Sequence, residues 1–275
     1  MRDVTLGQYY PADSPLHRLD PRVKLIGTLL FIILAFVAQT FIGLALIAAF
    51  MLSMALISKV PLKALFKGLK TIYILLAFTF LMNLFFSNSK SDHVLLKWGF
   101  IVISREGLIR AAFMAVRLIL LVTGASLMTL TTSPIALTDG MERLMSPLAK
   151  IGFPAHETAM MMSIALRFIP TLIEETDKIM SAQKARGADL ESGGVMQRAK
   201  ALLPILIPLF VSAFRRADEL ALAMECRCYH GGEGRTRMKQ MKLHGRDLIS
   251  GVATAAVFAG VILLNKYVNL LPTIW

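Results

Sequence analysis

The chain has 275 residues, of which 56% are hydrophobic and only 17% charged, and its mean hydropathy is +0.63. These values exclude a soluble globular protein, whose surface carries more charge, and they predict an integral membrane protein. The net charge of +12 is then expected to mark cytoplasmic segments rather than a nucleic-acid site. The two cysteines, Cys226 and Cys228, are too close in sequence for a disulfide framework and favour a reducing compartment.

Five stretches are apolar enough to cross a bilayer, which takes about 20 residues. They are residues 23–38, 41–57, 71–86, 118–130 and 247–264. The polar, proline-containing N-terminal residues do not resemble a cleavable signal peptide, and none is expected.

Lys and Arg gather before the first stretch and between the second and the third. By the positive-inside rule, this places the N-terminus in the cytoplasm and the C-terminus outside. Three arginines before the fourth stretch oppose this orientation, because they fall on the expected outer side. Arg105, Arg110 and Arg117 are therefore assigned to an amphipathic interfacial helix over residues 105–117.

Residues 131–246 differ from the rest of the chain, because their apolar residues recur at helical spacing among charges. This pattern predicts three cytoplasmic helices, over residues 135–150, 155–186 and 197–227. Pro170 is expected to kink the second helix. The predicted organisation is a membrane domain of residues 1–131 with four spans, a cytoplasmic region of residues 132–246, and a C-terminal span within residues 247–275.

The last two of these helices end alike. Arg186 and Arg227 each follow an aspartate by nine residues, and each lies between two small residues. Small neighbours allow a partner to approach closely, and the guanidinium carries five donors in a rigid fork that suits carboxylates and carbonyls. Two matched ends predict two equivalent sockets, which a dimeric or pseudo-dimeric partner offers. The candidate partner-binding residues are Ala185, Arg186, Gly187, Cys226, Arg227 and Cys228.

A plainer interpretation is that each arginine only satisfies the carbonyl groups at the end of its own helix, where the dipole favours a cation. The methionines of the same helices, such as Met160, Met161 and Met224, are also ambiguous. They suit a soft contact face and plain core filling about equally well.

Enzymatic functions are not supported by the motifs. No Gly-rich loop with a Lys-Ser/Thr ending occurs, so the chain is not expected to be an enzyme or to hydrolyse ATP. Cys226, Cys228 and His230 fall one ligand short of a structural zinc site, and neither a metal nor another cofactor is expected. Two alternatives stay open: a conventional ABC permease subunit that lines the substrate path, and a membrane scaffold without an ATPase partner.

Five short runs carry a resemblance to a known family. They are Thr131-Thr132-Ser133-Pro134, Phe168-Ile169-Pro170, Gln183-Lys184-Ala185-Arg186-Gly187, Met224-Glu225-Cys226-Arg227-Cys228-Tyr229 and Gly231-Gly232-Glu233-Gly234-Arg235-Thr236. Together they are similar to the T components of energy-coupling-factor (ECF) transporters. The resemblance extends over nearly the whole chain, and the paired small-Arg-small endings are the signature of that family.

The resemblance implies a non-catalytic, multi-pass subunit of an ECF-type ABC importer in the plasma membrane of a prokaryote. Such a subunit would join two ATPases, identical or paired homologues, to a substrate-binding S component in the bilayer, for uptake of a vitamin or metal ion and without nucleic acid. Arg186 and Arg227, with their neighbours, would lie in grooves of the two ATPases. The cysteines on both sides of Arg227 depart from the more usual alanine or glycine, but cysteine is also small.

Overall fold

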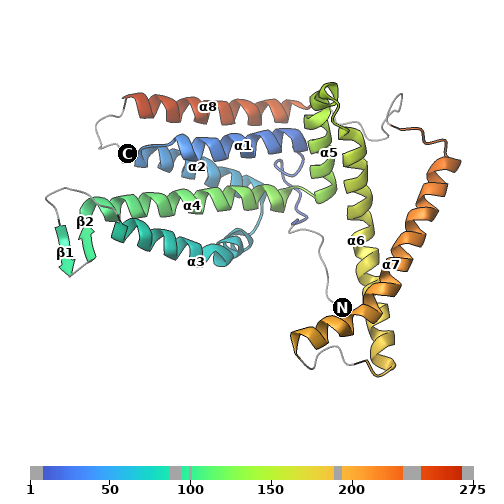
Figure 1. Ribbon diagram of the computed structural model, residues 1–275. Helices are drawn as coiled ribbons and strands as arrows, with labels where there is room; N and C mark the ends of the chain where they lie inside the picture. Colours follow the sequence, from blue (N-terminus) through green and yellow to red (C-terminus); the bar gives the residue numbers. More distant parts are fainter. Residues whose placement is uncertain (1–8, 87–93, 99–100, 189–193, 232–242, 268–275) are drawn as a thin grey trace. The chain divides into compact units, whose positions relative to one another are not determined.

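The computed structural model describes residues 9–86, 94–98, 101–188, 194–231 and 243–267, and most of these are helical (Figure 1). The predicted class of an all-α membrane protein is confirmed by the helix content and by the presence of helices long and apolar enough to cross a bilayer. The chain forms two compact units, one of residues 142–240 and one of residues 7–141 and 241–275. They are named here the α6–α7 unit and the membrane unit.

The membrane unit holds the apolar helices. They are α1 (Pro21–Val37), α2 (Phe41–Ser58), α3 (Leu62–Phe86), α4 (Arg105–Thr131) and α8 (Gly245–Tyr267), and the first part of α5 (Pro134–Met145) also belongs to this unit. By length and composition, α2, α4 and α8 qualify as spans, and α3 is a fourth if its two parts, which meet at 62°, count as one. The remaining predicted span, α1, has 17 residues, at the lower end of what crosses a bilayer.

Helix α1 begins at a cluster of carboxylates. Asp20 caps the helix by accepting a hydrogen bond from the backbone of Arg22 at 2.9 Å, and Pro21 occupies the first turn, where no N–H is needed. Asp247, at the start of α8, accepts from the backbone amides of Asp20 and His244, both at 2.8 Å. The two helices therefore start side by side, although 227 positions separate Asp20 from Asp247.

The other end of α1 is also held by side chains from distant helices. Asn265 near the end of α8 donates to the carbonyl of Val37 at 2.8 Å. Arg117 of α4 donates from Nη2 to the carbonyl of Ala38 at 2.6 Å, and its guanidinium carbon lies 4.8 Å from the centre of the Phe113 ring. Since α8 meets both ends of α1 in the same order, α1 and α8 run parallel, whereas α4 runs antiparallel to them.

The predicted interfacial helix over residues 105–117 was wrong. These residues form the first part of one continuous 27-residue helix, α4. Arg117 is only 4% exposed and so does not lie on a solvated polar face. It is buried because it caps the C-terminal end of α1, where carbonyl groups lack helical partners. Burying a guanidinium requires compensating contacts, and the carbonyl and the ring supply them.

Two further differences from the sequence analysis concern short elements. No element was predicted between residues 86 and 105, but β1 (Val94–Trp98) and β2 (Ile101–Ser104) form an antiparallel hairpin that leads directly into α4. The helix predicted over residues 135–150 changes after Met145 from α5 into the 3₁₀ helix η1 (Ser146–Ile151). Pro147 explains the change, because it has no N–H for the carbonyl of Arg143.

One apolar core joins α1, α2, α3, α4 and α8, and its fully buried members include Leu34, Leu44, Ile47, Leu65, Phe113 and Val261. Helices α1 and α4 approach most closely where Phe31 meets Gly124. A Cβ atom on Gly124 would lie only 2.4 Å from Cε1 of the Phe31 ring. Glycine at this position therefore permits the close contact of the two helices.

Gly124→Ala is expected to lower the free energy of unfolding by about 1–3 kcal/mol, because the added methyl group would overlap the buried Phe31 ring and force it to shift. Gly27→Ala in α1 is the matched control, since nothing lies within 4 Å of a Cβ atom placed there. That variant should be neutral or stabilised by up to about 1 kcal/mol through helix propensity. Thermal unfolding in detergent measures both, and equal midpoints for the two variants would contradict the packing argument.

Candidate functional site

The α6–α7 unit is built on two long antiparallel helices, α6 (Ala155–Ala185) and α7 (Val195–Cys226), which cross one another (Figure 1). Gln183 near the end of α6 donates to the carbonyl of Pro204 near the start of α7 at 3.3 Å. Farther along, Glu175 contacts Arg216. The predicted boundaries of both helices are confirmed to within about two residues.

The contact between Gln183 and Pro204 follows from the prolines of α7. In a regular helix the carbonyl of Pro204 would accept from the N–H of residue 208, but residue 208 is also a proline and has none. The amide of Gln183 takes the place of that missing donor. The prolines thus leave the carbonyl of Pro204 without its helical donor, and the side chain of Gln183 bonds α6 to α7 at this carbonyl.

A second contact fixes the crossing of the helices. The Glu175 carboxylate accepts hydrogen bonds from the Ser212 hydroxyl and from Arg216 Nη2, the latter at 2.9 Å. These contacts lower the pKa of Glu175: the Ser212 hydrogen bond has the largest effect, and Arg216 adds to it against the opposing effect of burial. Glu175 therefore stays ionised at neutral pH and joins α6 to α7 by a charge-assisted contact.

The end of α6 is a Schellman motif. Arg186 is the C-cap, Gly187 takes a left-handed φ of +84°, and its amide donates to the carbonyl of Lys184 at 3.0 Å. The amide of Ala188 donates to the carbonyl of Gln183, also at 3.0 Å. These two bonds define the motif. Gly187 thus ends α6 in the left-handed conformation, which glycine adopts without a steric penalty.

The end of α7 repeats this geometry. Arg227 is the C-cap, and the amides of Cys228 and Tyr229 donate to the carbonyls of Glu225 and Met224 at 2.8 and 3.0 Å. Cys228 occupies the position of Gly187 and has a φ of +55°. This backbone conformation is unfavourable for a residue with a Cβ atom. The two predicted endings therefore match in three dimensions, residue for residue.

In both motifs backbone amides already bond the helix-terminal carbonyls, so the plainer interpretation of the arginines loses its main support. Arg186 and Arg227 are exposed, as are the small residues that flank them: Ala185, Gly187, Cys226 and Cys228. The C-terminal ends of α6 and α7, which carry Arg186 and Arg227, are named here the arginine tips. Because the helices are antiparallel, the two tips lie at opposite ends of the pair (Figure 1). From Pro204, level with Gln183, to Arg227 the distance along α7 is about 35 Å at the usual helical rise.

One tip borders a hollow that the sequence analysis did not foresee. A cavity of about 350 Å³ lies where the end of α7 meets the first half of α6. Met160 and Ile164 line it from α6, and Met224, Arg227 and Tyr229 line it from the end of α7. Among its lining residues, the sequence analysis had singled out Arg227 and Cys228 as candidate partner-binding residues, and Met160 and Met224 as possible contact residues.

The thiols and guanidinium groups of the site are exposed. Cys226 and Cys228 are free and exposed. Within the described part of the chain, no three His, Cys, Asp or Glu side chains are grouped so that they could hold a metal ion. Two exposed guanidinium groups at separate helix ends suit recognition of carboxylates and carbonyls on a partner.

Comparison with known proteins shows the family of the chain. Residues 12–238 match the family model CbiQ, described as a cobalt transport protein. The chain belongs to the CbiQ/EcfT family. Energy-coupling factor transporter transmembrane protein EcfT of Clostridium kluyveri is 56% identical over 266 residues, which are 97% of this chain and 98% of the relative.

Two other EcfT proteins support this assignment. The protein of Thermosediminibacter oceani is 53% identical over 96% of this chain and 98% of its own length. That of Bacillus subtilis is 46% identical over 94% and 97%. As a CbiQ/EcfT member, the chain is a membrane-embedded transporter subunit, and the recognition made from the sequence runs is confirmed.

Cys228→Gly is expected to stabilise the protein by about 0.5–1 kcal/mol, because glycine adopts the left-handed conformation without a steric penalty. Gly187→Ala should be destabilising by about 1 kcal/mol for the converse reason. Cys226→Gly is the matched control, since Cys226 ends α7 in a helical conformation and the change should cost about 1 kcal/mol. Thermal unfolding in detergent measures all three, and the same sign for the two cysteine variants would refute the assignment of Cys228 to the left-handed position.

Ser212→Ala is expected to raise the pKa of Glu175 towards its ordinary value, because it removes the largest cause of the lowered pKa. A carboxyl whose pKa is lowered by folding stabilises the protein above its unfolded pKa, and this contribution disappears as the pH falls through the folded pKa. The variant should therefore lose the α6–α7 contact at higher pH than the wild type. Carbon-13 NMR titration of labelled glutamate measures the pKa, with Ser181→Ala, whose hydroxyl bonds within α6, as control.

Proposed function

We propose that this chain is the coupling subunit of an ECF-type importer, which transmits ATP-driven motion from two ATPase subunits to a separate S component that binds the substrate. The observation that carries the proposal is the pair of matched Schellman motifs with exposed arginines at their C-caps. Each tip offers the same guanidinium on the same backbone geometry, so each fits the same kind of groove. The two ATPases are identical or are paired homologues.

The separation of the tips supports two sockets rather than one. Tips at opposite ends of a crossed pair, about 35 Å apart along α7, cannot enter one groove together. A dimer of ATPases offers two equivalent grooves related by symmetry. In the proposed mechanism, ATP binding closes the dimer, the grooves move relative to each other, and α6 and α7 follow this movement.

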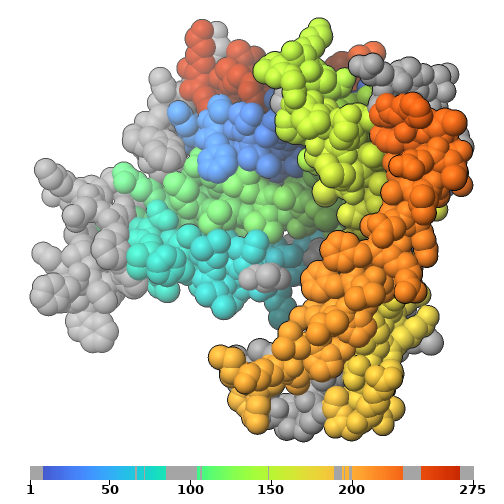
Figure 2. All heavy atoms as spheres, turned by 45° about the vertical axis from the view of Figure 1, so that its right-hand side comes forward, coloured from blue at the N-terminus to red at the C-terminus, as the bar shows by residue number. Residues whose placement is uncertain are grey.

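A second partner is supported by apolar side chains that α6 and α7 leave uncovered. Met161 and Met162 of α6 are 59% and 51% exposed, so they do not fill a core among the residues that the structure describes. Helix α7, which lies at the front in Figure 2, exposes a longer series. Its members are Leu202, Leu203, Leu206, Ile207, Phe210, Val211 and Phe214. An apolar surface of this kind requires a protein partner or lipid, and we assign it to the S component.

The orientation follows from the same proposal. The N-terminus and the arginine tips face the cytoplasm, where ATP is available, and the C-terminus lies outside in the plasma membrane of a prokaryote. The parallel course of α1 and α8 is consistent with this, since both helices then run outward. ATP hydrolysis and substrate specificity reside in the partner chains, and the cargo is a vitamin or a metal ion.

The double variant Arg186→Glu and Arg227→Glu is expected to abolish co-purification of the ATPases, because each reversed charge meets a groove suited to a cation. Each single alanine variant should weaken binding by about 2–5 kcal/mol and impair uptake. Pull-down from native membranes, followed by identification of the bound proteins and an uptake assay, provides the measurement.

Arg215→Glu is the matched control, because Arg215 is exposed on α7 but lies away from its end. It should bind ATPases as the wild type does. Unchanged assembly and uptake in the double variant would refute the proposal. Recovery of ATPases without any separate substrate-binding membrane protein would favour a conventional permease instead.

A further inference from the structure

Helix α4 stops at Thr131 and α5 starts at Pro134, so the two helices meet at a joint of two residues, Thr132 and Ser133. At the joint, two backbone carbonyl groups at the end of α4 lack the amide donors that a continuing helix would supply. The carbonyl of Leu130 would ordinarily accept from residue 134, which is a proline without an N–H, and the carbonyl of Thr131 lies at the last helical position. These residues are buried, so their carbonyls need partners within the protein.

The N-terminal segment supplies the first partner. The amide of Tyr10 donates to the carbonyl of Leu130 at 2.9 Å, in place of the donor that Pro134 lacks. We name residues 9–20 together with Lys24 the N-terminal clasp.

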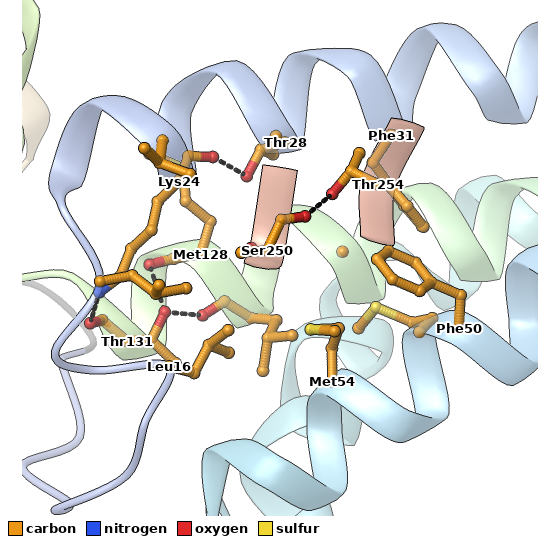
Figure 3. Close-up of a pocket in the computed structure, with 16 residues that line it drawn as sticks. Leu16, Lys24, Thr28, Phe31, Phe50, Met54, Met128, Thr131, Ser250 and Thr254 are labelled. Carbon is orange, nitrogen blue, oxygen red and sulfur yellow. Dashed lines mark hydrogen bonds between the residues drawn. The ribbon is translucent and has the colours of Figure 1, made fainter. Parts of the chain in front are cut away.

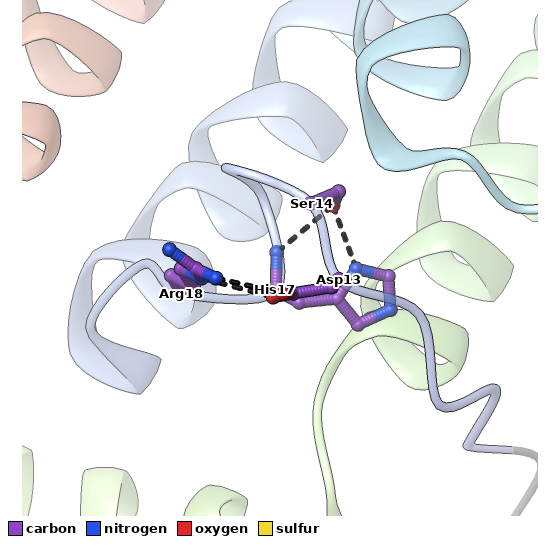
Figure 4. Close-up of polar contacts among 4 residues, drawn as sticks. All are labelled: Asp13, Ser14, His17 and Arg18. Carbon is purple, nitrogen blue, oxygen red and sulfur yellow. Dashed lines mark hydrogen bonds and ion pairs between the residues drawn. The ribbon is translucent and has the colours of Figure 1, made fainter.

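The clasp is held by its own polar contacts (Figure 4). Arg18 forms a bidentate ion pair with Asp13 at 2.9 and 2.7 Å. Both ring nitrogens of His17 are bonded, Nδ1 to the Ser14 hydroxyl at 2.7 Å and Nε2 to the carbonyl of Tyr10 at 3.0 Å. A carbonyl only accepts, so Nε2 carries the proton and the neutral ring accepts from Ser14. Partial burial lowers the pKa of His17, which agrees with a neutral ring.

Lys24 supplies the second partner. Its Nζ donates to the carbonyl of Thr131 at 2.8 Å (Figure 3). The same Nζ donates to the carbonyl of His17 at 3.2 Å, so one ammonium group joins residues 9–20 to the end of α4. The side chain also lines a cavity of about 90 Å³ between α1, α2, α4 and α8. Burying the ammonium group of a lysine in such an apolar site costs free energy unless its donors are bonded. Neither a transport path nor an arginine tip explains the position of Lys24.

On the α5 side of the joint, the start of α1 also makes a close contact. A Cβ atom on Gly140 of α5 would lie 2.9 Å from Cβ of Pro21, the first residue of α1. The start of α1 thus contacts α5 through Pro21 and the end of α4 through Lys24. Beyond Met141 the same helix continues into the α6–α7 unit.

We propose that the N-terminal clasp keeps the α4–α5 joint rigid, so that force entering α5 from the α6–α7 unit reaches the membrane helices instead of bending the joint. Lys24 is its positioning residue, because it acts by bonding the last carbonyl of α4. The proposal rests on the proposed function for the source of that force, whereas the rigidity of the joint does not depend on it.

The test compares Lys24→Met with wild type. Hydrogen exchange of the full chain in detergent should become roughly 3-fold to 10-fold faster at amides of residues 127–137. In reconstituted complexes with the co-purifying ATPases and S component, uptake per ATP hydrolysed should fall by a similar factor, while ATPase recovery stays normal. Lys24→Arg retains donors and should recover much of the ratio, and Lys63→Met, at an exposed lysine of α3, should match wild type in both assays.

Unchanged exchange in Lys24→Met would overturn the proposal, as would faster exchange with an unchanged uptake ratio in complexes that transport. Should Lys24→Met fail to assemble, Tyr10→Pro decides, because it deletes the amide donor to Leu130 and leaves Lys24 in place, and it should shift both readouts in the same direction by a smaller factor. A wild-type chain that recruits no ATPase would refute the proposed function, and the exchange result would still decide whether the clasp holds the joint.

Discussion

The ends of the helices impose the constraint on which this structure depends, because a backbone N–H or C=O group withdrawn from water needs a partner within the protein. In the membrane unit these partners are side chains from distant segments. Asp247 bonds the start of α1, Asn265 and Arg117 bond its end, and Lys24 bonds the end of α4. Each ionised group is placed where the terminal groups of a helix favour its charge. The same contacts set the relative directions of α1, α4 and α8.

The α6–α7 unit meets the constraint differently, and this difference makes it suitable for binding. Schellman motifs bond the terminal carbonyls of α6 and α7 with backbone amides alone. Although Arg186 and Arg227 occupy the C-cap positions, their side chains are therefore not needed to bond the helix-terminal carbonyls, in contrast to that of Arg117. A residue type that is structural in one unit is available to a partner in the other, and the backbone geometry decides which role it takes.

Prolines determine where segments are joined. Pro134 removes the donor for Leu130, and the N-terminal segment supplies another; Pro208 removes the donor for Pro204, and α6 supplies another. In each case a carbonyl that lacks its helical donor accepts a hydrogen bond from another segment of the same unit. Such contacts lie at the α4–α5 joint and where α6 meets α7, the places through which a coupling subunit would carry force.

The sequence by itself determined the membrane class, the helical conformation of the five apolar stretches, the two long helices and their matched endings, because apolar periodicity, helix length and left-handed caps are local properties of the chain. The break at Pro147 is equally local and could have been predicted. Only the tertiary structure decided the roles of Arg117, Lys24 and Asp247. Their partners lie 79, 107 and 227 positions away, so the sequence shows a charge near an apolar stretch but not which helix end that charge will meet.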